Sequence, residues 1–109
     1  MVLKNRLKVF KMVLVVSLKK GANGSLLVIS DKDIIGKKFE EGKLQLDLTT
    51  DFYFGDEKSK DEIKLMIKSA RDVFITGKEA IALMVEMDLI NTSRIIYVNG
   101  VPHAQIALS

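Results

Sequence analysis

The chain has 109 residues, of which 48% are hydrophobic and 28% charged, and its formal net charge is +3. This length suits one globular domain, and this composition excludes an intrinsically disordered chain. With no cysteine and a single histidine, the sequence excludes disulfides, cysteine nucleophiles and metal sites built from thiolates or several histidines. A carboxylate metal site stays open, but we predict no metal and no cofactor.

Positive charge is concentrated in the first thirty residues, which contain six basic residues and no acidic one. This asymmetry favours a polyanionic partner, nucleic acid first, although a solvated basic arm is the alternative. We predict a basic N-terminal arm over residues 1–11 and a single domain over residues 12–109, with Met1 or Met12 as the true start. No stretch reaches the roughly 20 apolar residues of a spanning helix, so we expect a cytoplasmic protein with no membrane partner.

Two β-branched apolar runs open the domain. Residues 12–18 and 25–29 predict the strands of a hairpin, joined by a longer loop that contains Lys19, Lys20 and two glycines. Residues 30–33 can then cap a short helical turn.

Alternation and aromatic residues mark the middle of the chain. Residues 43–49 alternate between polar and apolar side chains, which predicts a strand with one wet face. Three consecutive aromatics, residues 52–54, follow in a turn, where at least one of them is expected to be partly exposed. Such a ring can stack on a base, although packing against the sheet is commoner.

Two helices are predicted next. A capping box at residues 59–62 precedes apolar residues at helical spacing from residue 63 to Phe74, which predicts an amphipathic helix. The same capping spacing at residues 76–79 opens a second helix that is apolar on most sides. Three strands, two helices and two final strands predict the α+β class, with a small mostly antiparallel sheet, two main helices and a C-terminal β-hairpin.

The final hairpin is predicted from Asn99 and Gly100, which form a two-residue turn of the primed type. The turn sets the cross-strand pairs: Val98 with Val101, Tyr97 with Pro102, Ile96 with His103, Ile95 with Ala104, and Arg94 with Gln105. Because side chains alternate along a strand, Arg94, His103 and Gln105 share an exposed polar face, while Tyr97 faces the core. Pro102 has no N–H to donate, so we expect a sheet edge or a bulge there.

Several segments together resemble a known family. They are residues 33–39 (DIIGKKF), 41–42 (EG), Leu44, Leu46 and Asp47, residues 52–55, Thr76 and Gly77 before a helix, and residues 100–105 (GVPHAQ). The series is similar to the archaeal domain-of-unknown-function family 424, over roughly residues 12–108. The resemblance implies a small archaeal cytoplasmic protein, predicted to bind RNA and related to translation, and it implies no catalytic residue. Phe74 departs from the pattern, which has a small polar residue there.

The predicted function is binding of RNA or a ribonucleoprotein without chemistry, and no DNA specificity is predicted. The candidate phosphate contacts are Lys11, Lys19, Lys20, Lys37 and Lys38, and the candidate local contacts are Arg94, His103 and Gln105. The pair Lys37 and Lys38, after Gly36, can clasp a phosphate or be a solvated pair. Gly77 and Lys78 do not form a phosphate-binding P-loop, because no glycine-rich loop precedes them.

Two other function classes stay open. One is a small metabolite-binding protein or enzyme that uses His103, with Arg94 as an anion anchor. The other is a protein-interaction module that docks through a sheet edge. We expect His103 to lie at the surface, so that His103→Ala leaves the stability nearly unchanged.

Overall fold

The computed structural model describes residues 13–108 and confirms the predicted α+β class. The strands are β1 (Leu14–Gly21), β2 (Gly24–Asp31), β3 (Lys38–Glu41), β4 (Leu44–Asp47), β5 (Asp56–Lys58), β6 (Asp72–Thr76), β7 (Ile96–Val98) and β8 (Val101–Ala107). The helices are α2 (Lys60–Ile67) and α3 (Lys78–Glu86), with single 3-10 turns η1 (Lys32–Ile34), η2 (Asp51–Tyr53) and η3 (Thr92–Arg94).

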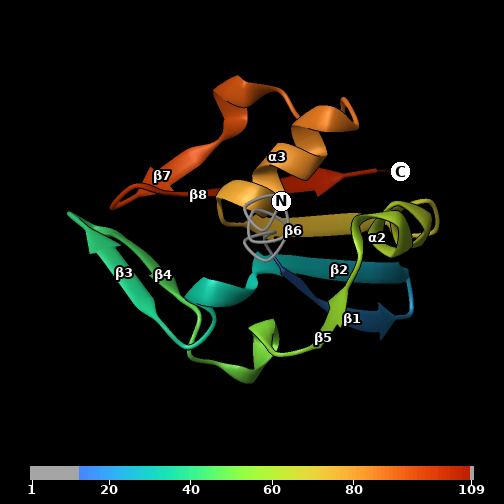
Figure 1. The fold of residues 1–109 in the computed structure, drawn as a ribbon, viewed down its shortest axis with the longest axis horizontal. Coiled ribbons are helices and arrows are strands. Elements are labelled where there is room, and N and C mark those ends of the chain that lie inside the picture. The colour runs from blue at the N-terminus through green and yellow to red at the C-terminus, as the bar shows by residue number, and fades with distance from the viewer. Residues whose placement is uncertain (1–12, 109) are drawn as a thin grey trace, which may run out of the picture.

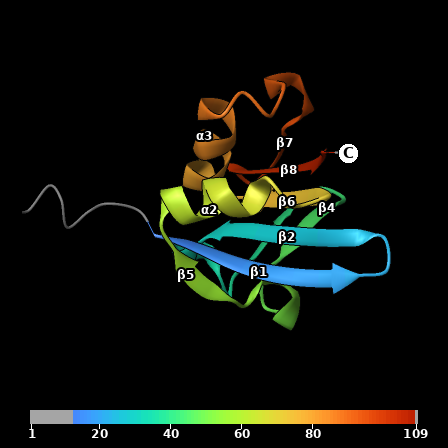
Figure 2. The ribbon, with the colours of Figure 1, turned by 90° about the vertical axis from the view of Figure 1, so that its right-hand side faces the viewer.

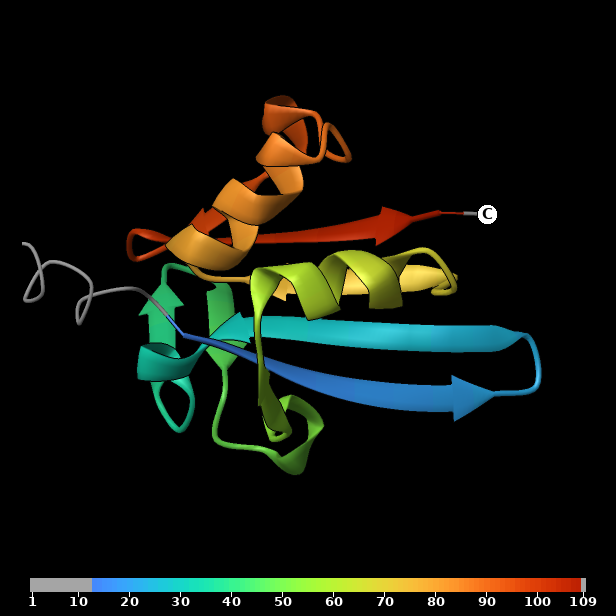
Figure 3. The same ribbon diagram turned by 45° about the vertical axis from the view of Figure 1, so that its right-hand side comes forward.

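A six-stranded sheet in the order β5-β1-β2-β6-β8-β7 forms the centre of the fold (Figure 1). Strands β2 and β6 run parallel, and the other neighbouring pairs are antiparallel. Both helices lie on one side of this sheet, and the two-stranded sheet β3-β4 lies on the other side, toward one end (Figures 2 and 3). The sheet therefore has a helix face and an opposite face that the fold covers only in part.

The main core lies between the sheet and the helices. Alternate residues of β1, β2 and β6 point toward α2 and α3, where Ile29, Val73 and Ile75 are fully buried against Ile63 and Met84. A smaller cluster on the opposite face packs β4 against the final hairpin. Its buried members are Leu46, Leu48 and Val98.

The two long hairpins differ in how well the sequence predicts them. The register of the final hairpin is confirmed, with Ile96 opposite His103, and the turn residues Asn99 and Gly100 have φ of 49° and 83°. The predicted long loop between the first two strands is wrong, because the strands continue to Gly21 and Gly24. Lys19 and Lys20 therefore lie within β1.

Helix α2 begins as predicted and ends earlier than predicted. The capping box is confirmed, since Ser59 and Glu62 exchange backbone–side-chain hydrogen bonds of 3.0 and 3.1 Å. The helix ends at Ile67, and the chain turns into β6, so the assignment of Phe74 to a helix is wrong. Residues 73–76 (VFIT) are β-branched or aromatic, and they pair with β2 and β8 on both sides.

Four further expectations about the C-terminal region are corrected. His103 is only 9% exposed, so its predicted surface position is wrong. Strand β8 lies inside the sheet and not at its edge. Pro102 has no N–H to donate, but this costs no hydrogen bond to β6, because the pairing of β8 with β6 begins at His103. The predicted pair of Arg94 with Gln105 does not form, because β7 begins at Ile96, and Tyr97 is 57% exposed on this edge strand.

Within residues 13–108, no helix is both long enough and apolar enough to cross a bilayer. The predicted arm over residues 1–11, and Lys11 with it, lies outside the described residues.

Candidate functional site

A row of rings crosses the sheet face that lies opposite the helices. Tyr53 and Phe52 come from η2, which contacts β1 and β2, while Phe74 comes from β6 and His103 from β8. Neighbouring centroids along this row are 5.1, 5.6 and 6.0 Å apart, and each pair meets edge to face. Such geometry is favourable for aromatic pairs and holds each ring in place. We call Tyr53, Phe52, Phe74 and His103 the ring row.

The alternation of the strands positions this row. Phe74 and Thr76 point away from the helices because Val73 and Ile75, which alternate with them along β6, point into the main core. Their partners on β8 are Gln105 and His103, so all four side chains share one face. Phe52, Tyr53 and Phe74 are each half-buried, so the row presents ring surface to solvent.

His103 is fixed by its neighbours. Its Nδ1 lies 2.8 Å from Oγ1 of Thr76, and its Nε2 lies 3.5 Å from Nε2 of Gln105. Burial lowers the pKa of His103, which favours a neutral ring at neutral pH. Among the described residues no carboxylate bonds to this ring, although a general base normally has such a partner to orient it. His103 therefore acts here as a structural part of the row.

A buried hydroxyl lies on the other side of Thr76 from this histidine. Ser30 on β2 is paired in register with Thr76 and is fully buried, and its Oγ has no hydrogen-bond partner among the described residues. Ser30, Thr76 and His103 thus form a buried polar line across β2, β6 and β8. His103 belongs to both this line and the ring row, and Tyr53 at the other end of the row packs against the apolar cluster under β3-β4.

Polar side chains lie beside two rings of the row, Phe52 and His103. Nζ of Lys19 lies 5.1 Å from the centre of the Phe52 ring, a cation–π contact, and 3.0 Å from Oγ of Ser17. Gln105 is exposed beside His103, the last ring of the row. The structure therefore brings three of the predicted site residues, Lys19, His103 and Gln105, to one face.

The other predicted residues lie elsewhere. Lys20 points to the helix face, because it follows Lys19 on the same strand. Lys38 is in an ion pair with Glu40 at 3.5 Å on β3, and Arg94 is exposed in η3. Lys37 lines a cavity of about 360 Å³ at the end of the sheet where β2 finishes.

This cavity brings together three of the segments that carry the family resemblance. Residues 33–39, the start of α3 and the turn of the final hairpin all contribute to its walls. Its charged side chains have both signs: Asp31, Asp33 and Glu79 against Lys37 and Lys78. The mixture of charges favours no single class of ligand.

The positive end of α3 at this cavity is already occupied. The carboxylate of Asp31 accepts hydrogen bonds from the backbone N–H groups of Glu79 at 3.1 Å and Ala80 at 2.8 Å. The predicted capping box at residues 76–79 is therefore wrong, and Gly77 is the N-cap residue. Burial raises the pKa of Asp31, while the two hydrogen bonds act in the opposite direction. A helix start that holds its own carboxylate has no room for an external anion.

No cluster of three or more histidine, aspartate or glutamate residues that could hold a metal occurs in residues 13–108.

The residue that the sequence patterns do not reveal is Phe74, the centre of the ring row. The run of residues 73–76 contains a strand signal, but the apolar spacing from residue 63 onward favours a helix.

Comparisons with known proteins concern family and fold. The family model described as "Protein of unknown function (DUF424)" matches residues 19–108. No curated protein matches the chain. The chain is similar to a solved structure described as an uncharacterized conserved protein from Methanopyrus kandleri, with a TM-score of 0.70 and 20% identity, over 89% of this chain and 95% of that chain. Likeness at this identity shows a shared fold.

Proposed function

We propose that this chain, which belongs to the DUF424 family of proteins of unknown function, binds single-stranded RNA on the ring row. The family membership that the sequence predicted is confirmed by the match over residues 19–108. The observation that carries the proposal is the row of rings on a sheet face, three of them half-buried, with Lys19 beside Phe52 and Gln105 beside His103.

Sheet faces with exposed rings suit unpaired nucleotides. Every base has a π-face, so a base can stack on Phe52 or Phe74 whatever its sequence, and each stacked base contributes about 1–3 kcal/mol. A duplex hides its base faces, and we therefore expect single strands to be preferred. The amide of Gln105 can bond to the edge of a stacked base, and the ammonium of Lys19 can bind a phosphate.

The first thirty residues add charge to this argument. They contain six cations and no acidic residue, and Lys19 belongs to both this basic region and the ring row. Electrostatic attraction of this kind is independent of sequence and of sugar type. We therefore propose no preference for RNA over single-stranded DNA at the ring row itself. The family resemblance also implies an archaeal origin, a link to translation and a cytoplasmic location. We include these three expectations in the proposal.

Fluorescence anisotropy with a labelled RNA single strand of about eight nucleotides tests the proposal. Phe52→Ala and Phe74→Leu each remove one ring, and each is expected to weaken binding about tenfold. The matched control is Phe54→Ala, because Phe54 is the neighbouring aromatic, is 47% exposed and lies outside the ring row. Equal losses from Phe54→Ala and Phe52→Ala would overturn the proposal.

A charge control completes the design. Lys19→Gln should weaken binding and lower the dependence on salt, whereas Lys43→Gln, on the far turn between β3 and β4, should do neither. A duplex RNA of the same length should bind more weakly than the single strand. Equal affinity for duplex and single strand would contradict stacking on the rings.

The structure gives less support to the two other function classes, the metabolite-binding protein or enzyme and the protein-interaction module. Among the described residues His103 has no acidic partner, and it lines neither the cavity of about 360 Å³ nor a cavity of about 410 Å³ on the helix face. Both edge strands of the main sheet, β5 and β7, have only three residues. Beyond β5 the outer edge of β1 is free of other described strands over residues 17–21, and the lysines there, Lys19 and Lys20, disfavour pairing with another strand.

A further inference from the structure

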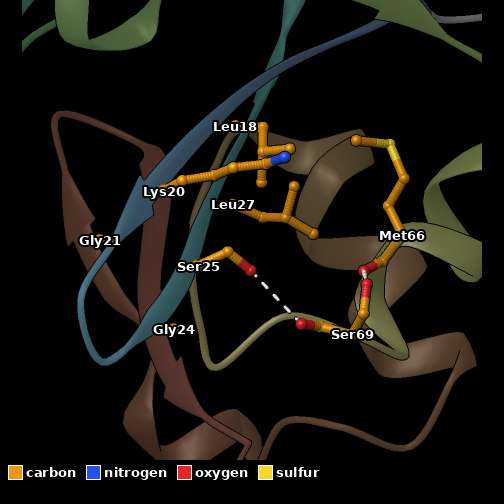
Figure 4. Close-up of a pocket in the computed structure, with 8 residues that line it drawn as sticks. All are labelled: Leu18, Lys20, Gly21, Gly24, Ser25, Leu27, Met66 and Ser69. Carbon is orange, nitrogen blue, oxygen red and sulfur yellow. Dashed lines mark hydrogen bonds between the residues drawn. The ribbon is translucent and has the colours of Figure 1, made fainter.

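The cavity of about 410 Å³ on the helix face lies between the turn of the β1-β2 hairpin and the end of α2 (Figure 4). Its apolar wall consists of Leu18, Leu27 and Met66, and its polar rim of Lys20, Ser25 and Ser69. This volume is in the range of small-ligand sites. Leu18 is 45% exposed although it points toward the helix side, so part of the wall is uncovered apolar surface.

The rim presents a defined set of polar groups. The hydroxyl of Ser25 donates to the backbone oxygen of Ser69, and the hydroxyl of Ser69 donates to that of Met66, both at 3.3 Å. Their protons are used, so their oxygens remain free to accept hydrogen bonds from a ligand. Figure 4 shows the side chain of Lys20 reaching across the cavity, on the same side as Leu18 and Leu27. A ligand here meets an apolar wall, hydroxyl acceptors and one ammonium group.

Positive charge collects at this end of the molecule. Lys19 and Lys20 lie near the end of β1, while Lys68 and Arg71 follow α2, and Arg71 donates to the backbone oxygen of Asn23 in the hairpin turn. None of these four cations forms an ion pair within the described part of the chain. Unpaired cations beside an apolar cavity fit an anionic ligand with a flat apolar part.

The cavity and the ring row lie on opposite faces of the sheet, and each has a lysine of β1 beside it, Lys20 at the cavity and Lys19 at the row. Strand β5 pairs with β1 only at residues 14–16, so the outer edge of β1 has no partner strand beyond them among the described residues. Lys19 and Lys20 are consecutive residues that point to opposite faces across this free edge. A nucleic-acid backbone can therefore pass from Lys19 to Lys20 without crossing another element of the fold.

We propose that this cavity receives one unstacked base of the strand that lies on the ring row, with the adjoining phosphates at Lys20, Lys68 and Arg71. The inference rests on the proposed function and adds a second contact point to it. A base is favoured over the apolar side chain of an acidic peptide because Lys19 and Lys20 link the cavity to the ring row across the free edge of β1, and because the hydroxyl oxygens of the cavity match the amino groups of bases.

The test combines methyl spectra with oligonucleotides of two lengths. The full chain, labelled at methionine and leucine methyl groups, is titrated with single-stranded RNA of about four and about eight nucleotides. We expect the Met66 and Leu27 methyl signals to shift with the longer strand only, because the ring row accommodates the whole of the shorter one. Leu18→Ala should weaken binding of the longer strand about fivefold and leave the shorter one unchanged.

Leu65→Ala is the matched control. Leu65 is 65% exposed on the same helix as Met66 and does not line the cavity, so its truncation should change neither affinity. If the longer strand binds and Phe52→Ala and Phe74→Leu weaken its binding, but the Met66 signal does not shift, the cavity inference is wrong and the proposed function stands. If neither strand binds at low salt, both are wrong. If an acidic peptide shifts Met66 and RNA does not, the cavity serves a protein partner and the inference is overturned.

Discussion

The carboxylate of Asp31 occupies the space in which a side chain on Gly77 would begin. A Cβ placed on Gly77 would collide with the carboxyl carbon and both oxygens of Asp31, and Gly77 has φ of 113°. Asp31 uses these oxygens to cap α3 from β2, and it precedes the two residues that donate to it by 48 and 49 positions. Glycine at position 77 is thus needed both for its backbone conformation and for its lack of a side chain.

Gly77→Ala should destabilise the protein by about 3 kcal/mol or more, because it adds a collision to the cost of a positive φ. Gly36→Ala is the control, since Gly36 has φ of 87° but no atom within 4 Å of its added Cβ. That variant should be destabilised by only about 1 kcal/mol. Urea denaturation gives both free energies of unfolding, and similar values for the two variants would show that space at Gly77 is not limiting.

Asp31→Ala should cost about 1–2 kcal/mol, because it leaves the N–H groups of Glu79 and Ala80 without their acceptor. Asp33→Ala removes an exposed carboxylate from the same cavity and should change the free energy of unfolding by less than about 0.5 kcal/mol. Amide exchange at Ala80 measures the local effect. Unchanged exchange at Ala80 in Asp31→Ala would contradict the capping role.

The stability of the protein should fall as the pH is lowered through the range in which His103 titrates. Burial puts the pKa of His103 below its usual value of about 6.5, so the unfolded chain binds the proton first and unfolding becomes more favourable. The fall in stability begins near pH 6.5 and is complete below the pKa of the folded protein. Urea denaturation at about pH 7.5 and about pH 5.5 should show this fall.

His103→Gln isolates that effect, because the chain has no other histidine. This variant should be less stable than the wild type at the higher pH, since it disturbs the bond to Thr76, and acidification should destabilise it less. An equal pH dependence of stability in the two proteins would assign the effect to carboxylates instead. A variant as stable as the wild type at the higher pH would show that His103 contributes nothing to the packing of the sheet.

Deletion of residues 1–11 should weaken RNA binding and leave the fold unchanged. The deleted residues carry four cations, whereas the strands and helices of the described residues 13–108 form both apolar clusters among themselves. For each phosphate that these cations no longer neutralise, the log–log dependence of affinity on salt should fall by about 0.7 on a single strand. An unchanged salt dependence would show that these cations do not bind the strand.

Local signals in the sequence are sufficient for the final hairpin and for the start of α2. Asn99 and Gly100 specify their turn through positive φ, and Ser59 with Glu62 specifies a helix start, so both depend only on neighbouring residues. Strand β6 is not predicted, because the apolar residues from 63 to 74 match a helical period by chance and favour one continuous helix. Nothing local separates the last of them, Phe74, from the helix before it.

The site depends on long-range pairing, which the sequence does not reveal. Phe52 and Phe74 meet only because β2 pairs in parallel with β6, and Asp31 reaches α3 for the same reason. In the final hairpin, His103 and Gln105 share one face as predicted, but the predicted exposure of His103 is wrong. His103 is buried because Phe74 and Thr76 lie against it on β6.

The position of β8 in the sheet has a consequence for synthesis on the ribosome. Strand β8 fills the place between β6 and β7, and it follows both of them in the chain. Chains emerge from the amino end at about 5–20 residues per second, so β6 has an unpaired edge until residues 101–107 have left the exit tunnel. During that interval the backbone groups of a strongly apolar strand are open to other nascent chains. Slower translation of the region between α3 and β8 would lengthen this interval and raise the yield of aggregates.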